Sequence, residues 1–194
     1  RTCRRGGWLM PTAWTVRAIT RASLPVLLAL TLVEVGSGLV LGRFEATLLR
    51  YPSLLVLVPV TIGTAGNLGS VLASRLSTAF HLGLLSFDPA DETLLGNAAA
   101  VVGLAATTFP VVGAGAWGLT ALLGDARLPL RDVLAVAMTA GLALAAGAVT
   151  VALGATYAAY RFELDPDDVV IPVVTNACDV LGVLVLFAAV HAFV

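Results

Sequence analysis

The chain has 194 residues, of which 59% are hydrophobic and 12% are charged. Soluble domains contain roughly 45–50% apolar and about 25% charged residues, so this chain has too few charges to cover a soluble surface. Its net charge of −1 gives no bulk attraction to nucleic acid, and we expect no nucleic-acid partner. Its two cysteines, Cys3 and Cys178, indicate neither a disulfide framework nor a zinc site. The composition therefore predicts one integral membrane domain.

The first 22 residues form a basic lead-in to the first apolar segment, with arginines at Arg1, Arg4, Arg5, Arg17 and Arg21. A signal peptide has a similar polarity, but its apolar core spans only about 7–15 residues. The apolar run that follows here is longer, which favours a membrane-spanning helix. Under the positive-inside rule the lead-in is cytoplasmic or interfacial.

Five segments approach or exceed the roughly 20 apolar residues that a spanning helix needs. They cover residues 23–42, 53–74, 94–123, 130–159 and 169–194. We therefore predict an all-α integral membrane bundle, with residues 23–194 as one five-helix domain embedded in lipid. An odd number of crossings places a cytoplasmic N-terminus and an outer C-terminus on opposite sides of a cytoplasmic membrane.

Only two carboxylates, Glu34 and Asp179, lie well inside the apolar segments. A charged side chain at mid-membrane costs about 2.5–3.5 kcal/mol on insertion scales, so such residues are usually functional. Thr175 and Asn176 precede Asp179 by four and three residues and share its helix face. Together they offer the oxygen ligands that Mg²⁺ and Ca²⁺ take. The alternative is a protonated aspartic acid bonded to a neighbouring helix. Glu34 is either a pathway or proton-coupling residue or a buried structural acid.

The second apolar segment contains Pro59 and closely spaced glycines at Gly63, Gly66 and Gly69. Proline removes a helical hydrogen bond and glycine weakens a helix. These residues predict a break whose freed carbonyls line an ion path together with Asn67. The alternative is a continuous glycine stripe for helix packing, with one buried asparagine.

Acidic residues gather in two loops that this topology makes cytoplasmic. They are Asp88, Asp91 and Glu92 in one loop and Glu163, Asp165, Asp167 and Asp168 in the other. They form either ordinary solvated loops or an acidic vestibule that concentrates cations.

Two separated motifs resemble the MgtE and solute-carrier-41 family of magnesium channels and transporters. The first is Gly66-Asn67-x-Gly69 followed by Ala73-Ser-Arg-Leu-Ser-Thr-Ala79, and the second is Asp165-Pro166, Ile171-Pro172-Val-Val-Thr175 and Asp179-Val-Leu-Gly182. Phe44-Glu45 and Pro52 also fit the family's first loop. The resemblance extends from about residue 25 to the end and is closest to the solute-carrier and archaeal type without CBS domains.

The resemblance implies a pore formed by two five-helix units, so the partner would be an identical copy or a sister subunit. It makes Mg²⁺ the transported ion, with no organic cofactor, and Asp179 the main pore ligand. Gly66 and Asn67 line the family's pore, and Thr175 is an outer contact. Asn97 matches a third-helix position where some members carry Glu. We take Asn97, Asn176, Glu34 and Asp165 as candidates for a secondary cation pathway.

Two alternatives belong to other classes. The chain is a non-transporting scaffold subunit in one of them. In the other it is an intramembrane enzyme in which Glu34 and Asp179 form an acid–base pair. The sequence has no Gly-x-Ser-x-Gly nucleophile elbow and no histidine-rich metal site, so we predict that it is not an enzyme.

Overall fold

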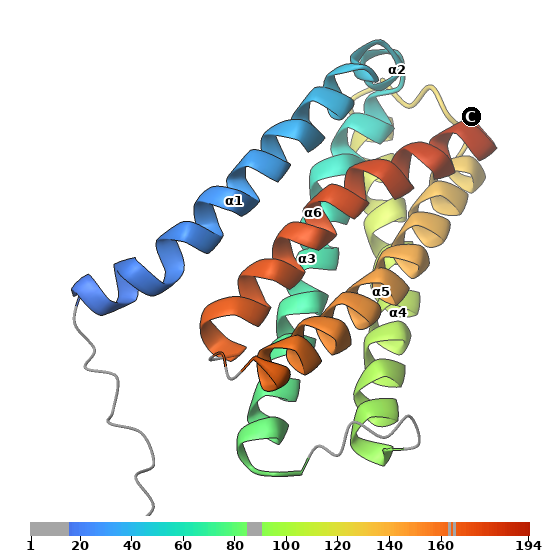
Figure 1. Ribbon diagram of the computed structural model, residues 1–194. Coiled ribbons are helices and arrows are strands. Elements are labelled where there is room, and N and C mark those ends of the chain that lie inside the picture. The colour runs from blue at the N-terminus through green and yellow to red at the C-terminus, as the bar shows by residue number, and fades with distance from the viewer. Residues whose placement is uncertain (1–15, 85–90, 163, 165) are drawn as a thin grey trace, which may run out of the picture.

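The computed structural model describes residues 16–84, 91–162, 164 and 166–194. In these residues the fold is entirely helical (Figure 1). The helices are α1 (Val16–Gly42), α2 (Glu45–Arg50), α3 (Pro52–His81), α4 (Glu92–Leu122), α5 (Leu130–Arg161) and α6 (Pro166–Phe193). Asp88, Glu163 and Asp165 lie outside the described residues.

Five of the described helices are long and apolar enough to cross a membrane. The candidate spans are Ser23–Gly42, Pro52–His81, Glu92–Leu122, Leu130–Arg161 and Val169–Phe193. The predicted all-helical fold with five membrane-spanning helices is therefore confirmed for this part of the chain. The short helix α2, which joins the first two spans, was not predicted because one and a half turns carry no readable periodicity.

The chain alternates direction through the bundle, so α1 and α6 run the same way (Figure 1). The start of α1 and the end of α6 consequently lie at opposite ends of the bundle. This agrees with an odd number of crossings. Which end is cytoplasmic stays a prediction from the arginine distribution.

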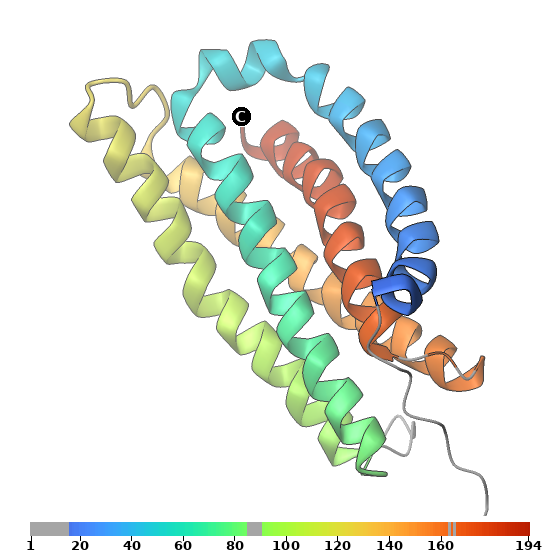
Figure 2. The same ribbon diagram turned by 90° about the vertical axis from the view of Figure 1, so that its left-hand side faces the viewer.

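Helices α3 and α5 each pack against α4 and α6 and against each other, whereas α1 packs chiefly on α6. Figures 1 and 2 both show α1 beside α6 and away from α4. In the 18-residue stretch that best fits a span, α1 has no buried residue, in contrast to the other four spans. Large apolar side chains such as Leu32 and Leu39 are exposed along it. In a bilayer these side chains face lipid or another protein.

Small residues let the bundle helices approach closely. The ring of Phe109 on α4 is fully buried against Gly141 on α5, where an added Cβ would overlap it. An added Cβ at Gly113 on α4 would lie 2.8 Å from the Cβ of Ala137 on α5. Association of membrane helices depends on such packing, because lipid tails are as apolar as leucine and no hydrophobic force drives the helices together.

Local signals define the helix ends next to the loops. Asp91 caps α4, because its carboxylate accepts hydrogen bonds from the backbone N–H groups of Thr93 (2.7 Å) and Leu94 (3.2 Å). Gly83 and Gly124 follow α3 and α4 with φ of 67° and 78°. Both complete the paired backbone bonds of a Schellman motif, which favours glycine in the left-handed region. Asp91, predicted as part of an acidic loop, therefore has a structural role as well.

Candidate cation site

Asp179 is half-buried near the middle of α6, at the seam where α6 packs on α3. Opposite it on α3 is Gly66, which is buried. A Cβ built on Gly66 would lie 3.9 Å from Asp179 Oδ1 and 3.7 Å from Thr175 Cγ2. The absent side chain at Gly66 thus leaves α3 close to the carboxylate without crowding it. The two motifs singled out in the sequence meet near the middle of both helices.

Two hydroxyl groups extend this polar seam by one turn. Ser70 Oγ lies 3.0 Å from Thr175 Oγ1 and also donates to the Gly66 carbonyl at 2.8 Å. Thr175 Oγ1 donates to the Ile171 carbonyl at 2.9 Å. Two hydroxyl protons cannot serve all three contacts at once, and at most one of the four hydroxyl lone pairs accepts within this pair. The other lone pairs can accept hydrogen bonds from the waters of a hydrated ion.

Ser70 was missed as a site residue by the sequence analysis. It lies four residues after Gly66 and therefore on the same helix face, which is the signal that would have found it. Serine is common at packed membrane-helix faces in any case, so the spacing alone does not separate a packing role from a site role.

Glu34 of α1 lies near Asp179, on the helix that packs against α6. It is half-buried, and its carboxyl group lies close enough to interact directly with that of Asp179. The two intramembrane carboxylates found in the sequence are thus brought together by helices at opposite ends of the chain. Two carboxylates facing each other without a counter-charge repel, so the pair favours a bound cation or a shared proton.

Asn176 contributes a second kind of oxygen to the same helix, α6. Its Oδ1 atom is buried and has no hydrogen-bond partner among the described residues. Asn176 lies three residues before Asp179 and so one turn away on a neighbouring face of α6. An unsatisfied buried carbonyl oxygen costs about 1–3 kcal/mol, which a water or an ion would offset.

The remaining predicted residues are not gathered here. Asn67 is exposed on α3, on the outer face of the single chain. Asn97 is on α4, where its Oδ1 accepts from Arg75 Nε at 2.6 Å and its Nδ2 donates to the Thr93 carbonyl at 2.7 Å. A guanidinium so near makes Asn97 a poor position for a cation. Asp165 lies outside the described residues.

The predicted break in the second span is absent, and that expectation was wrong. Helix α3 is continuous from Pro52 to His81, through Pro59 and the glycines. At Gly69, α3 and α6 are in close contact, because an added Cβ would lie only 2.7 Å from Val174 Cγ1. Of the three glycines, Gly69 acts by close packing, as the alternative proposed, whereas a Cβ on Gly63 would meet nothing within 4 Å. The buried asparagine of that alternative is not found, because Asn67 is exposed. The Gly66 carbonyl, engaged by Ser70, is not freed by an interruption of the helix.

No group of three or more His, Cys, Asp or Glu side chains within metal-binding distance occurs among the described residues. One chain thus brings two carboxylates and several neutral oxygens to the seam. Mg²⁺ takes six oxygen ligands and usually keeps several of them as water. The oxygen set of one chain suits a hydrated ion rather than a fully dehydrated one.

A multi-pass helical membrane protein with carboxylates, hydroxyls and a glycine gathered at mid-span has the features of an ion transporter. Comparison with known protein families identifies which family of transporters this is. A family model described as MgtE, divalent cation transporter, matches residues 58–189, which is more than half of the chain. The chain therefore belongs to the MgtE family of divalent cation transporters and is not an enzyme, as predicted. No solved structure matches it.

Proposed function

We propose that this chain carries Mg²⁺ across the cytoplasmic membrane through a path lined by the seam of α3 and α6. The observation that carries the proposal is the half-buried Asp179 at mid-membrane, facing Gly66 across a gap with room beside its Oδ1 atom. A carboxylate at this depth is stabilised by a passing cation and otherwise costs several kcal/mol. The family match supports a divalent cation as cargo.

In this proposal Asp179 holds a largely hydrated ion by accepting hydrogen bonds from its water shell. Mg²⁺ dehydrates reluctantly and usually keeps several of its waters, so contact through water suits a site that offers only one or two carboxylates. Thr175 and Ser70 accept from further waters of the shell. Glu34 supplies a second negative charge on the α1 side, which raises the local attraction for a divalent ion over a monovalent one.

We propose further that two copies, or this chain and a sister subunit, complete the path. The exposed stripe on α3 that includes Gly63 and Asn67 adjoins the Gly66–Asp179 seam. Pairing two such stripes would bring Asn67 and Asp179 of both subunits to a common axis. Closed two-fold pairing is the commonest assembly of soluble oligomers. A second copy of this chain would add further oxygen ligands for the ion, so no different subunit is needed.

The direct test is Mg²⁺ flux into liposomes that contain the purified chain, read with an enclosed Mg²⁺-sensitive dye. Asp179→Asn keeps the shape but removes the charge. It should lower flux about tenfold or more, because a contact to a charged group is worth about 1.5–3 kcal/mol. Asp125→Asn, in the exposed loop between α4 and α5, is the matched control and should keep parental flux.

Two results would overturn the proposal. Equal flux in the Asp179→Asn variant and the parent would remove Asp179 from the path. No metal-dependent flux from well-folded parent protein, in the presence of any of Mg²⁺, Mn²⁺, Co²⁺, Ni²⁺ or Ca²⁺, would favour the scaffold alternative. Preference for another ion in the same series would retain the path but change the cargo.

A further inference from the structure

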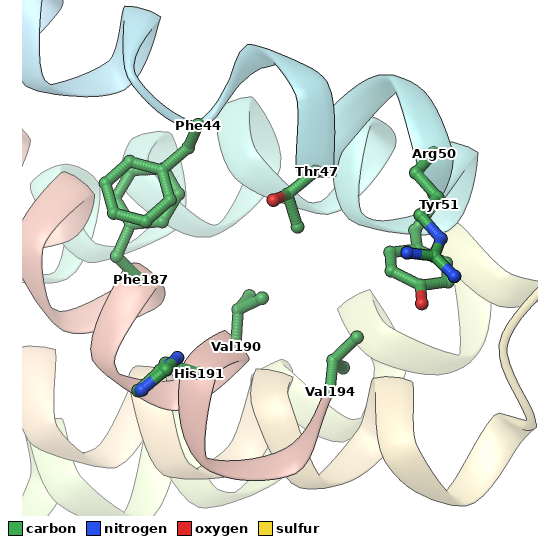
Figure 3. A pocket seen from close by; sticks show the side chains of 8 residues that line it. All are labelled: Phe44, Thr47, Arg50, Tyr51, Phe187, Val190, His191 and Val194. Atoms are coloured by element: carbon green, nitrogen blue, oxygen red, sulfur yellow. The ribbon is translucent and has the colours of Figure 1, made fainter.

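A pocket of about 220 Å³ lies between α2 and the last turns of α6, apart from the Asp179 seam. Figure 3 shows the side chains that line it. Phe44 and Phe187 lie at one end, Arg50 and Tyr51 lie at the other, and Thr47 of α2 lies between them. The volume is several times the roughly 30 Å³ that one water occupies in the liquid. It therefore has room for a small polar group, such as a phosphate.

Arg50 is the only Arg, Lys, Asp or Glu among the residues that line this pocket. Arg50 and Tyr51 form one end, with the Arg50 guanidinium 5.4 Å from the centre of the Tyr51 ring, and His191 lines the wall on α6 (Figure 3). No Asp or Glu is among the lining residues. Such a surface attracts an anion, and the cation that we propose as cargo would be repelled by Arg50.

A second guanidinium reaches the same corner from the loop between α4 and α5. Arg127 Nη1 donates to the backbone carbonyl of Arg50 at 3.3 Å. That contact ties the end of α2 to a distant loop and adds positive charge beside Arg50. The Arg50 end of the pocket is thus held by two segments of the chain, the end of α2 and the loop between α4 and α5.

Aromatic side chains form the opposite end of the pocket, where Phe44 and Phe187 stack (Figure 3). Phe44 follows the candidate span Ser23–Gly42 by two residues, and Arg50 precedes the candidate span Pro52–His81 by two residues. The pocket therefore combines an aromatic end and a cationic end at the boundary of two spans, which is the level at which aromatic side chains meet lipid headgroups.

We propose that this pocket binds the headgroup phosphate of an anionic membrane phospholipid, with Arg50 as its main contact and Thr47 as a further donor. The phosphate accepts from the Arg50 guanidinium, and the first acyl carbons lie along the Phe44–Phe187 stack. Charge-assisted hydrogen bonds from arginine suit phosphate oxygens. The same donor chemistry would also suit free inorganic phosphate, and the test separates the two sources.

The test measures lipid binding by delipidated protein in detergent, using native mass spectrometry and thermal stability. Dioleoylphosphatidylglycerol is the probe, with dioleoylphosphatidylcholine and inorganic phosphate as comparisons. Arg50→Gln should weaken phosphatidylglycerol binding about tenfold, and Thr47→Val, a milder change of nearly equal shape, by a few-fold. Arg131→Gln is the matched control, since Arg131 is exposed and paired with Asp132.

The proposal predicts retained phosphatidylglycerol in the parent and in Arg131→Gln, with weaker retention in Arg50→Gln and Thr47→Val. Equal losses in Arg50→Gln and Arg131→Gln would mean general surface attraction and would overturn it. Stabilisation by inorganic phosphate equal to that by phosphatidylglycerol would overturn the lipid assignment. Should Arg50→Gln fail to fold, unchanged binding by Thr47→Val would be sufficient to reject the pocket.

Discussion

Gly66 and Gly69 lie one turn apart on α3 and both face α6, yet the structure predicts opposite effects when each is replaced by alanine. At Gly69 the new Cβ would lie 2.7 Å from Val174 Cγ1 and 3.2 Å from Cys178 Sγ. At Gly66 the nearest atoms, in Thr175 and Asp179, are at 3.7 and 3.9 Å. The first position is overpacked by one methyl group, and the second accepts it in ordinary van der Waals contact.

The magnitudes follow from these distances. Overpacking a close-packed interior costs about 1–3 kcal/mol, while replacing glycine by alanine within a helix gains up to about 1 kcal/mol. Gly69→Ala should therefore lower the unfolding free energy by about 1–2 kcal/mol. Gly66→Ala should be neutral or slightly stabilising. Its methyl group would nevertheless occupy the gap beside Asp179 Oδ1, so we expect slower Mg²⁺ flux from a stable protein.

The assay pairs reversible unfolding in mixed micelles with Mg²⁺ flux in liposomes for both variants. Gly154→Ala on α5 is the control, because a Cβ there meets nothing within 4 Å and Gly154 lies outside the proposed contact between copies. Unfolding of Gly69→Ala at the parental free energy would refute the close approach of α3 and α6. Parental flux from Gly66→Ala would refute a path along this seam while leaving the fold intact.

Three further predictions concern other parts of the molecule. Glu34→Gln should lower Mg²⁺ flux less than Asp179→Asn does, because Asp179 lies at the seam of α3 and α6 beside Gly66, whereas Glu34 only flanks Asp179 from α1. Flux equal to that of the parent would remove α1 from the path. With Cys3 and Cys178 replaced by serine, Asn67→Cys should cross-link two copies in the membrane, whereas Leu39→Cys, 72% exposed on α1, should not; the reverse pattern would place the contact between copies on α1. Gly124→Ala should lower the unfolding free energy by about 1 kcal/mol because φ there is 78°, and thermal denaturation at the parental midpoint would contradict this.

The location of the candidate site could be proposed from the sequence, for a physical reason. A carboxylate in contact with water costs little, whereas a carboxylate inside the membrane is costly. Glu34 and Asp179 are therefore conspicuous within their apolar segments. Helical periodicity then places Thr175 beside Asp179 without any structure. Ser70 and the pocket around Arg50 carry no such signal, since hydroxyls and arginines are ordinary at helix faces and interfaces.

The state of α3 was mispredicted because proline and glycine have two effects that the sequence does not separate. Both weaken an isolated helix, which is why a break was expected near Gly66. Inside a membrane, hydrogen bonds within the helix are the only cheap partners for its backbone, and neighbouring helices can hold a proline-containing helix together. Packing of Gly69 against Val174 and of Ile62 against Gly182 adds contacts along α3 that keep it continuous.

The sequence by itself determined that the chain is a five-span membrane protein with two costly carboxylates, because hydropathy and charge act locally along each segment. Only the tertiary structure decided that Glu34 and Asp179 meet and that Gly66 adjoins Asp179 while Asn97 is held by Arg75. These relations join helices far apart in the chain. Which faces meet depends on small residues and side-chain shapes across several helices at once, and no single segment contains that information.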